Sequence, residues 1–470
     1  MTSTPVALSL TGAQHQRIRD HLFPADGKEA VALLLCGRHA GEERHRLLVH
    51  EVVPVPYSRC TVRERDRVTW PTDLLDPLLA RATKDGFAIV KIHGHPTGFP
   101  RFSETDDASD KELFPSIYVW TDRVEPHGSA VMLPDGTVFG RTVSARGEFS
   151  PWARVSMVGD ELTFWSQVSD DMNKLPMHAE RIAQAFGKRT LQLLQKLRVA
   201  VIGCSGTGSL VIEQLARNCV GELVLLDPER IEDRNLNRIV NATKQHVGQL
   251  KVDVLKAAVE RMGLGTRVTA LATDLFFGTS IRAVAECDVI FGCVDAIEGR
   301  HLLNRIATYY TLPYFDVGVK LGVDSAGAIT RIEACSNYLQ PGKSTLLSRG
   351  MYTPNQLAAA FMKRRDPLEY ERRRREGYID GVAEERPAVM SVNMLAASFG
   401  VNDFLARIHS YRDVPNAFFD RQLMSLFLGV YDAEALPQPD VALARHVGGG
   451  FAQPLLGMPE FDEGLHEAAT

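Results

Sequence analysis

The chain has 470 residues, of which 45% are hydrophobic and 24% are charged, the balance of an ordinary globular protein. At this length we expect two or three domains, because one hydrophobic core seldom grows so large. Its formal net charge of -5 disfavours a nucleic-acid partner, no apolar stretch is long enough to cross a bilayer, and the first residues lack the pattern of a signal peptide, so no membrane association is expected. The 7 cysteines are scattered and never spaced Cys-x-x-Cys, which disfavours a disulfide framework and a cysteine zinc site and indicates a cytoplasmic protein with reduced thiols.

Residues 1–149 alternate between strand and helix patterns, as in a mixed α/β domain. Apolar runs of strand length predict strands over 30–37, 44–56, 87–96, 116–122, 128–134 and 136–143. An amphipathic helix is predicted over 71–86, where Gly86 provides the stop signal. Residues 150–180 are expected to form a connecting helical segment, and the clearest helical pattern covers 177–197.

A pattern of strand, glycine loop, helix and strand begins at Leu197 and predicts a βαβ unit inside a domain that spans 181–411. The expected elements are strands over 197–203, 222–227, 288–295 and 313–319, a helix over 208–221 and an apolar helix over 389–408. These strands are expected to lie in one mainly parallel sheet. The highly charged residues 363–377 predict an exposed helix or loop, and 412–470 form a C-terminal extension.

Two histidines and an aspartate with the spacing of metal ligands occur where the strand predicted over 87–96 ends. His93 and His95 occupy alternate positions of that strand, so both imidazoles face one side and can reach one ion. Ser103 and Asp106 are spaced as on the first turn of a helix, where the serine can also cap. Two imidazoles and a carboxylate would hold Zn²⁺ with a fourth position open to water, whose pKa the ion would lower to about 7. The pattern favours a catalytic zinc centre over a pair of surface histidines in a polar loop.

The motif His-x-His-Pro, six residues, Ser-x-x-Asp resembles that of the JAB/MPN (JAMM) metallopeptidases, which remove ubiquitin or ubiquitin-like tags. The resemblance implies a JAMM-type mixed α/β domain over 1–149. It assigns the zinc to His93, His95 and Asp106, and it makes Ser103 the residue that steadies the oxyanion.

The same resemblance implies a glutamate as general base just ahead of the first core strand. Glu29 stands at that place in "EAVALLLCG". Glu51 borders another strand and is a second candidate for the base. Asp107 is a second, weaker candidate for the carboxylate ligand.

The stretch "VIGCSGTGS" has the glycines of a phosphate-binding loop between a strand and a helix. Glycine lets the backbone approach phosphates, and the N-terminus of the helix favours their negative charge. Gly203, Gly206 and Gly208 are present, but Ser205 occupies the middle glycine position of G-x-G-x-x-G. Asp227 ends the next strand, where an acidic residue would bind ribose hydroxyls. By themselves these features also fit an NAD-dependent dehydrogenase.

The chain beyond this loop resembles the ThiF/MoeB/ubiquitin-activating-enzyme superfamily over about residues 180–411, in "NLNR", "GQLKVDVLKAA" and "VIFGCVDAIEGRHLLN". Members adenylate the C-terminal carboxylate of small β-grasp proteins, and the resemblance implies a Rossmann-like ThiF-type domain that binds ATP and Mg²⁺. It assigns ATP binding to Gly203, Ser205, Gly206, Gly208, Asp227, Asn235, Arg238, Lys251 and Asp295. Arg238, Lys251 and Asp295 would also stabilise charge during catalysis, the last through Mg²⁺. Arg181 would reach the ATP of a second subunit.

Cysteine marks two departures from that superfamily. Thr345 and Ser348 stand where many members carry Cys-x-x-Cys pairs, so no structural zinc is expected there. Residues 336–390 contain no cysteine that could take the acyl group as a thioester, and Cys335 is the nearest candidate. The enzyme either stops at the adenylate or forms a thioester on Cys335.

Together the two resemblances predict a bifunctional enzyme of a bacterial ubiquitin-like modification pathway, several of which serve in antiviral defence. One domain would adenylate a ubiquitin-like protein, and the other would process its precursor or remove the tag. The implied partners are the ubiquitin-like β-grasp protein, a separate conjugating enzyme and a second copy in a homodimer. The alternatives are trimming and adenylation of a ThiS/MoaD-like sulfur carrier, or a non-catalytic scaffold that keeps both folds.

Overall fold

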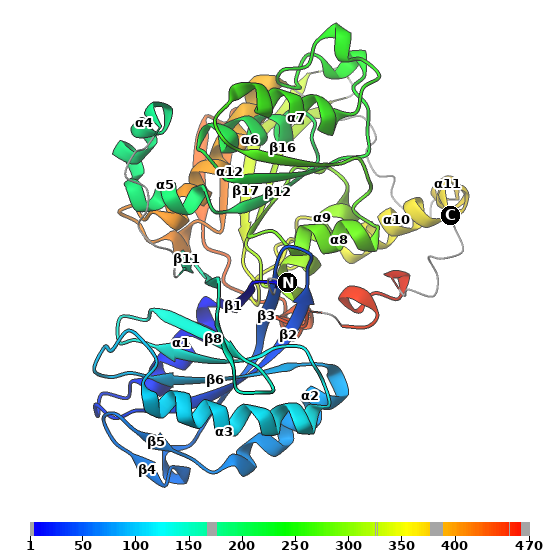
Figure 1. The fold of residues 1–470 in the computed structure, drawn as a ribbon. Helices are drawn as coiled ribbons and strands as arrows, with labels where there is room; N and C mark the ends of the chain where they lie inside the picture. The colour runs from blue at the N-terminus through cyan, green and yellow to red at the C-terminus, as the bar shows by residue number, and fades with distance from the viewer. Residues whose placement is uncertain are drawn as a thin grey trace. The chain divides into compact units, whose positions relative to one another are not determined.

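The computed structural model describes residues 4–166, 176–324, 326, 328–376, 389–450 and 452–461, and the chain divides into two compact units. The first unit contains Met1–Asp171, Tyr309–Thr311 and His446–Thr470, and the second contains Met172–Thr308 and Leu312–Arg445. Each unit is built around its own sheet (Figure 1). The α/β fold class that the sequence predicts is confirmed for both. The expected extension 412–470 is divided between them.

The described part of the first unit holds a nine-stranded sheet in the order β11-β10-β1-β3-β2-β6-β7-β8-β9. The strands are β1 (Val6–Thr11), β2 (Val31–Ala40), β3 (His45–Pro54), β6 (Ala88–Gly94), β7 (His127–Met132), β8 (Val138–Val143), β9 (Phe149–Pro151), β10 (Arg154–Val158) and β11 (Leu162–Trp165). The helices are α1 (Gly12–Leu22), α2 (Asp76–Asp85) and α3 (Glu104–Thr121), and β4 (Val62–Arg63) and β5 (Val68–Thr69) form a separate hairpin.

The central strand β2 is buried on both faces, which explains its continuous apolar sequence. Leu34 belongs to the hydrophobic cluster that contains Ile18 of α1, and Leu33 belongs to the cluster that contains Phe114 of α3. Because successive strand residues face opposite sides, α1 packs against one face of the sheet and α3 against the other.

The strand predicted over 116–122 is wrong, because these residues lie almost entirely in α3. The buried residues in the second half of α3 recur at helical spacing: Phe114, Ile117, Tyr118 and Thr121. The β-branched and aromatic residues there favour a strand by type, and the packing of this face on the sheet decides for a helix.

The helical segment expected over 150–180 is also wrong in its first half. β10 runs parallel to β1, with Ala7 opposite Arg154, and β11 returns antiparallel to β10. Neither β1 nor α1 is predicted from the sequence. Residues 167–175 of that segment lie outside the described residues, and the described helix begins at Met177. The single helix expected over 177–197 is interrupted at Gly187.

The described part of the second unit holds an eight-stranded sheet in the order β14-β13-β12-β15-β16-β17-β18-β19. Its strands are β12 (Arg198–Ile202), β13 (Glu222–Leu226), β14 (Arg267–Leu271), β15 (Val289–Gly292), β16 (Tyr314–Val323), β17 (Ile329–Leu339), β18 (Arg421–Ser425) and β19 (Val430–Glu434). The strands from β14 to β16 in this order are parallel, as predicted, and the last three are antiparallel.

Helices alternate with strands from β12 to β16, and the other helices of this part of the chain come before or after that stretch. They are α4 (Met177–Phe186), α5 (Lys188–Leu194), α6 (Gly206–Arg217), α7 (Lys251–Met262), α8 (Gly278–Ala285), α9 (Ile297–Tyr309), α10 (Pro354–Arg365), α11 (Pro367–Arg375), α12 (Met390–Ile408) and α13 (Val441–Ala444). The apolar helix α12 packs on α6, β16 and β17. In α11 the arginine run forms ion pairs along an exposed helix, with Arg372 and Arg373 both on Glu369.

Residues 446–450 return to the first unit and pack against β2 and β3. His50 Nδ1 lies 2.7 Å from the carbonyl oxygen of Val447. Gly448 has a positive φ, and a Cβ there would lie 2.3 Å from the carbonyl oxygen of Val49, so this contact requires glycine. Among the residues that the structure describes, none of the helices combines the length and the apolar character needed to cross a membrane.

Candidate metal centre and nucleotide pocket

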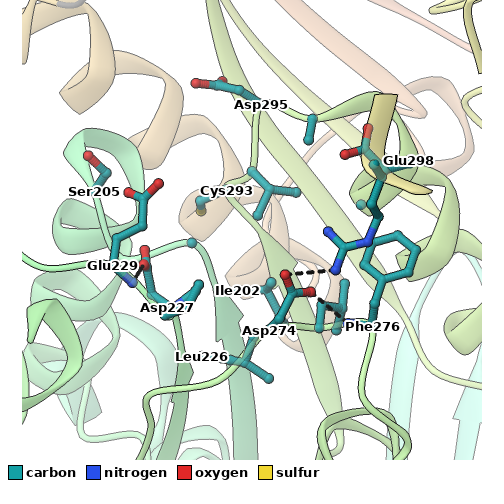
Figure 2. A pocket seen from close by; sticks show the side chains of 17 residues that line it. Ile202, Ser205, Leu226, Asp227, Glu229, Asp274, Phe276, Cys293, Asp295 and Glu298 are labelled. Atoms are coloured by element: carbon teal, nitrogen blue, oxygen red, sulfur yellow. Dashed lines mark hydrogen bonds and ion pairs between the residues drawn. The ribbon is translucent and has the colours of Figure 1, made fainter. Parts of the chain in front are cut away.

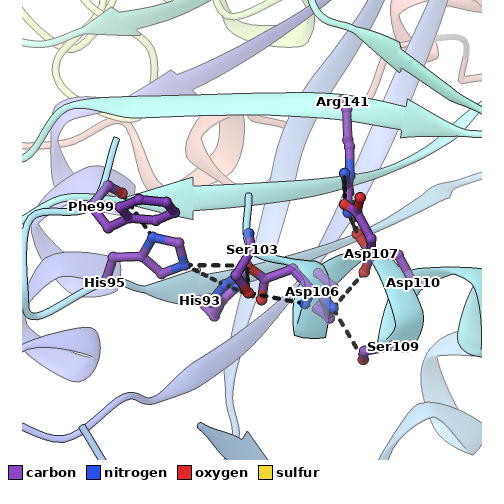
Figure 3. Close-up of polar contacts among 10 residues, drawn as sticks. His93, His95, Phe99, Ser103, Asp106, Asp107, Ser109, Asp110 and Arg141 are labelled. Carbon is purple, nitrogen blue, oxygen red and sulfur yellow. Dashed lines mark hydrogen bonds and ion pairs between the residues drawn. The ribbon is translucent and has the colours of Figure 1, made fainter. Parts of the chain in front are cut away.

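The predicted metal ligands meet where β6 ends and α3 begins (Figure 3). His93 Nε2 lies 3.0 Å from His95 Nε2 and 2.9 Å from Asp106 Oδ1. His95 Nε2 lies 3.4 Å from Asp106 Oδ2. In the described part of the chain, the potential ligand atoms of His93, His95 and Asp106 all lie within 4.8 Å of one another.

The donor set fits Zn²⁺ in type and in spacing. Tetrahedral zinc with ligands at about 2.0–2.1 Å places neighbouring ligand atoms about 3.3 Å apart, close to the separations seen here. Burial lowers the pKa of His93, which favours the neutral imidazole that a metal ligand must be. The Nδ1 atom of His95 faces the carbonyl oxygen of Phe99 at 2.8 Å, which leaves Nε2 for a metal. Burial opposes ionisation of Asp106, but hydrogen bonds from the two histidines hold its pKa well below the usual range.

Glu29 lies beside this cluster because β2 begins next to the end of β6, with Val31 opposite His93. The Glu29 side chain is buried. Burial raises its pKa to about 7; the nearby His95 acts in the opposite direction and Asp106 adds to the rise. A carboxylate that titrates near neutral pH is suited to proton transfer.

The two second candidates lie in other surroundings. Glu51 forms an ion pair with Arg81 and is 42% exposed at its side chain. Asp107 forms an ion pair with Arg141 of β8. Neither is part of the three-residue cluster.

Ser103 is the N-cap of α3 and lies at the edge of the cluster. Its hydroxyl donates a hydrogen bond to Asp106 Oδ2 at 2.7 Å and accepts one from the Asp106 backbone N–H at 3.1 Å. This capping arrangement fixes the first turn of α3 and brings the hydroxyl to the carboxylate ligand.

The glycine loop of the second unit joins β12 to α6 and is tightly folded. A Cβ at Gly208 would lie 1.8 Å from the carbonyl oxygen of Gly203, so no side chain fits there. Ser205 is the N-cap of α6, and its side chain makes no capping hydrogen bond. The N-terminus of this 12-residue helix is therefore suited to an anion.

A pocket of about 340 Å³ lies at the carboxyl ends of β12, β13 and β15, where parallel α/β sheets bind ligands (Figure 2). Four of the predicted residues line it: Gly203, Ser205, Asp227 and Asp295. Asp227 joins the glycine loop to the turn after β13. Its Oδ2 accepts the Cys204 N–H at 2.7 Å and its Oδ1 accepts the Glu229 N–H at 2.8 Å. Burial raises the pKa of Asp227.

Three other predicted residues are close to this pocket but are not among the described residues that line it. Lys251 is buried and forms an ion pair with Glu229, which does line the pocket. Arg238 lies over the glycine loop, with its Cδ 3.1 Å from the position of a Cβ at Gly206. Asn235 is buried and accepts the backbone N–H of residue 232 at 3.0 Å.

The remaining candidates lie elsewhere. Arg181 is on the exposed side of α4. Cys335 lies on β17 and is buried, and burial raises the pKa of its thiol to about 11. A thiol that stays protonated at neutral pH is a poor nucleophile. Thr345 and Ser348 hydrogen-bond each other in a turn, with the Thr345 N–H donating to Ser348 Oγ at 2.9 Å.

The pocket residues that sequence reasoning missed include Asp274, Phe276, Glu298 and Arg364. Asp274 follows β14, and its place after a parallel strand is a signal that could have been used. Arg364 belongs to α10, forms an ion pair with Asp274 at 2.8 Å and lies 3.8 Å over the ring of Phe276. No local sequence pattern connects α10 to this pocket.

Comparison with known proteins gives two family matches. Residues 178–403 match the model of the ThiF family. Residues 12–134 match the model of the prokaryotic homologs of the JAB domain.

Curated relatives match parts of the chain. The adenylyltransferase and sulfurtransferase UBA4 of Meyerozyma guilliermondii is 26% identical over 135 residues, 28% of this chain and 32% of the relative. The tRNA threonylcarbamoyladenosine dehydratase of Bacillus subtilis is 40% identical over 87 residues, 18% of this chain and 34% of the relative. The SUMO-activating enzyme subunit 2 of Dictyostelium discoideum is 26% identical over 140 residues, 29% of this chain and 21% of the relative. The match thus spans about a third of the first two relatives and a fifth of the third.

Solved structures of E. coli MccB also resemble the chain. The complex with ATP is 19% identical, covers 57% of this chain and 74% of that chain, and has a TM-score of 0.43. The free protein has a TM-score of 0.44 at 19% identity, covering 58% and 73%.

Proposed function

We propose that this chain, which joins a JAB-like domain to a ThiF domain, is a bifunctional enzyme of a bacterial ubiquitin-like modification pathway. Its ThiF domain adenylates the C-terminal carboxylate of a ubiquitin-like protein with ATP and Mg²⁺. Its JAB-like domain is a zinc peptidase that trims the precursor or removes the tag. One observation carries the proposal: the same chain holds the His93, His95 and Asp106 cluster and the glycine-loop pocket with Asp227 and Asp295.

Adenylation requires strong stabilisation of phosphate charge. An oxygen of the tag's carboxylate attacks the α-phosphorus of ATP, the bond to the bridging oxygen breaks, and pyrophosphate leaves. The N-terminus of α6 and Arg238 above it would bind phosphate oxygens. Lys251, beside the pocket, would supply a second cation. Asp227 would bind the ribose, and Asp295 would hold Mg²⁺.

Peptide cleavage would use the residues at the junction of β6 and α3. Zn²⁺ bound by the three ligands would polarise the scissile carbonyl and make a bound water acidic. Glu29 would accept a proton and pass it to the leaving amine, as its buried position and neutral-range pKa allow. The Ser103 hydroxyl, whose one proton goes to Asp106 in this structure, would turn and donate it to the developing oxyanion instead.

The burial of Cys335 favours an enzyme that forms no thioester of its own. The acyl group would then pass from the adenylate to the nucleophile of a separate conjugating enzyme.

The adenylation half is tested by measuring pyrophosphate release from ATP with the ubiquitin-like protein encoded beside the gene. We expect release that depends on the tag and falls at least about a hundredfold in Asp295→Asn, because the Mg²⁺ ligand is lost. Glu29→Gln is the control and should keep wild-type release. Tag-independent or absent release would count against this half.

The peptidase half is tested with a tag precursor that carries a C-terminal extension. Cleavage should stop on chelation, return with zinc, and be lost in Glu29→Gln. Glu51→Gln makes the same chemical change at the second candidate and should cleave normally. Loss in Glu51→Gln with retention in Glu29→Gln would reverse the assignment of the base.

A second candidate function is activation of a sulfur carrier. The name of the relative from Meyerozyma guilliermondii includes sulfurtransferase as well as adenylyltransferase, which favours this alternative. It predicts that a ThiS/MoaD-like carrier, incubated with the enzyme, ATP and a sulfur donor, acquires a C-terminal thiocarboxylate detectable by mass spectrometry.

We further propose a cytoplasmic homodimer in which Arg181 contacts the ATP bound by the other subunit. Mixing Arg181→Ala with Asp295→Asn should then restore part of the activity that each lacks alone. A role in antiviral defence predicts that Asp295→Asn abolishes protection of cells against phage.

A further inference from the structure

The strand that carries the histidines and the helix that carries the aspartate are joined by a second contact next to the metal cluster. Lys91 precedes His93 by two residues, so both side chains lie on the same face of β6. Asp110 follows Asp106 by four residues, so both lie on the same face of α3. The Lys91 Nζ atom lies 2.5 Å from Asp110 Oδ1, and the two side chains are 6% and 0% exposed. Two parallel contacts, His93 with Asp106 and Lys91 with Asp110, thus connect the strand to the helix.

A third element is fixed to the same carboxylate (Figure 3). Arg141 of β8 donates from Nη2 to Asp110 Oδ2 at 2.7 Å and from Nε to the same oxygen at 3.2 Å. Its guanidinium lies between the rings of Phe102 and Phe149, 3.8 and 3.6 Å from their centroids. Nη1 also pairs with Asp107, the residue next to the carboxylate ligand. These contacts fix the position of the first two turns of α3 along the strands of the sheet.

Stability alone is a poor explanation for this buried charge network. Replacing a buried ion pair with apolar residues of similar volume is often neutral or stabilising, because the charges no longer have to be removed from water. The network fixes the orientation of the Asp110 carboxylate, because Lys91 binds one of its oxygens and Arg141 binds the other. An apolar contact would allow the helix to slide along the strand.

We infer that Lys91, Asp110 and Arg141 are positioning residues that keep the Asp106 carboxylate in register with the two histidines, so that the metal site is preformed. The inference rests on the proposed zinc function of the cluster. None of the three residues is a ligand, and they act through the relative position of β6 and α3.

The test is metal binding by the full-length protein carrying Lys91→Met. Methionine keeps the length and volume of the side chain, and Asp110 stays paired with Arg141, so the variant should fold. We expect the dissociation constant for Zn²⁺, measured by competition with a chromophoric chelator, to rise about tenfold or more. The visible spectrum of bound Co²⁺ should also change, because the ligand geometry is altered.

Two controls separate positioning from loss of stability. Ile18→Ala removes buried volume from the first unit on the face of the sheet opposite α3, and it should lower the melting temperature without changing the Zn²⁺ constant. Glu112→Gln changes an exposed carboxylate on α3 itself and should change neither quantity. Arg141→Gln is the second test variant and should weaken binding in the same direction as Lys91→Met.

The outcomes distinguish this inference from the function on which it rests. If wild-type protein and all variants bind no zinc, the proposed zinc function fails. If the wild type binds zinc and both Lys91→Met and Arg141→Gln bind it equally well with an unchanged Co²⁺ spectrum, the positioning inference fails and the zinc function stands. Equal weakening in Ile18→Ala would likewise overturn the inference.

Discussion

The Nδ1 atom of His127 accepts a hydrogen bond from the backbone N–H of Ile89 at 2.9 Å, so the imidazole is neutral in the folded protein. The residue is fully buried between β6 and the ring of Tyr118, which meets it edge to face. Burial lowers the pKa of His127 to about 3, with a smaller contribution from the positive charge of Arg38.

This pKa predicts acid destabilisation of the first unit. In the unfolded chain the histidine takes up a proton below about pH 6.5, whereas the folded state resists protonation down to about pH 3. The contribution of neutral His127 to the free energy of unfolding is therefore fully present above about pH 6.5. It falls as the pH drops through this window, by about 2 kcal/mol between about pH 6.5 and pH 5. His127→Asn retains a hydrogen-bond acceptor that does not titrate, and urea unfolding should show a correspondingly flatter pH dependence. Parallel pH profiles of the two proteins would contradict the prediction.

Gly208→Ala should abolish pyrophosphate release. A methyl group at this position would meet the carbonyl oxygen of Gly203 at 1.8 Å, so the loop and the start of α6 must move apart. Cleavage of the tag precursor by the same variant reports on the first unit and should be unchanged. Normal pyrophosphate release by Gly208→Ala would show that the loop does not shape the ATP site.

Arg364→Ala should weaken ATP binding several-fold and change the maximal rate little. Arg364 lines the pocket and holds Asp274 and Phe276 in place, but it lies on α10, outside the glycine loop. The KM for ATP in pyrophosphate release measures the effect. Arg365→Ala removes the neighbouring exposed arginine and should leave the KM unaltered. A fall in the maximal rate without a change in KM would assign Arg364 to catalysis instead.

Cys335→Ser should leave both pyrophosphate release and transfer of the tag intact. The thiol is buried, and its raised pKa keeps it protonated at neutral pH. Incubation with tag and ATP, followed by electrophoresis without reductant, should show no thiol-sensitive adduct of the enzyme. Appearance of such an adduct, and its absence in Cys335→Ser, would restore the thioester alternative.

The residues found from the sequence share one property: their chemistry is contained in short spacings. His93, His95 and Asp106 lie within one strand–turn–helix segment, and Asp227 and Asp295 follow the ends of β13 and β15, two strands of a recognisable parallel sheet. The local rules for strands and helices place such residues without knowledge of distant contacts.

The residues that were missed depend on packing between elements far apart in the sequence. Asp110 of α3 meets Arg141 of β8, 31 positions further along the chain, and no local spacing in the sequence indicates this contact. Arg364 reaches the pocket through the placement of α10, which the charge pattern of 363–377 does not specify. The side-chain types of 116–122 indicated a strand, and those of 363–377 indicated only an exposed segment. In both segments the tertiary contacts determine the structure that forms.

The return of residues 446–450 to β2 and β3 has a consequence for synthesis of the protein. The second unit is, in chain order, an insertion within the first, since the first is completed by residues that follow Arg445. Translation therefore adds the residues of the second unit up to Arg445 before it adds the strip around Gly448 that packs against β2 and β3 of the first unit. The first unit begins first and is finished last, so a chain released early would carry a complete second unit beside an unfinished first one.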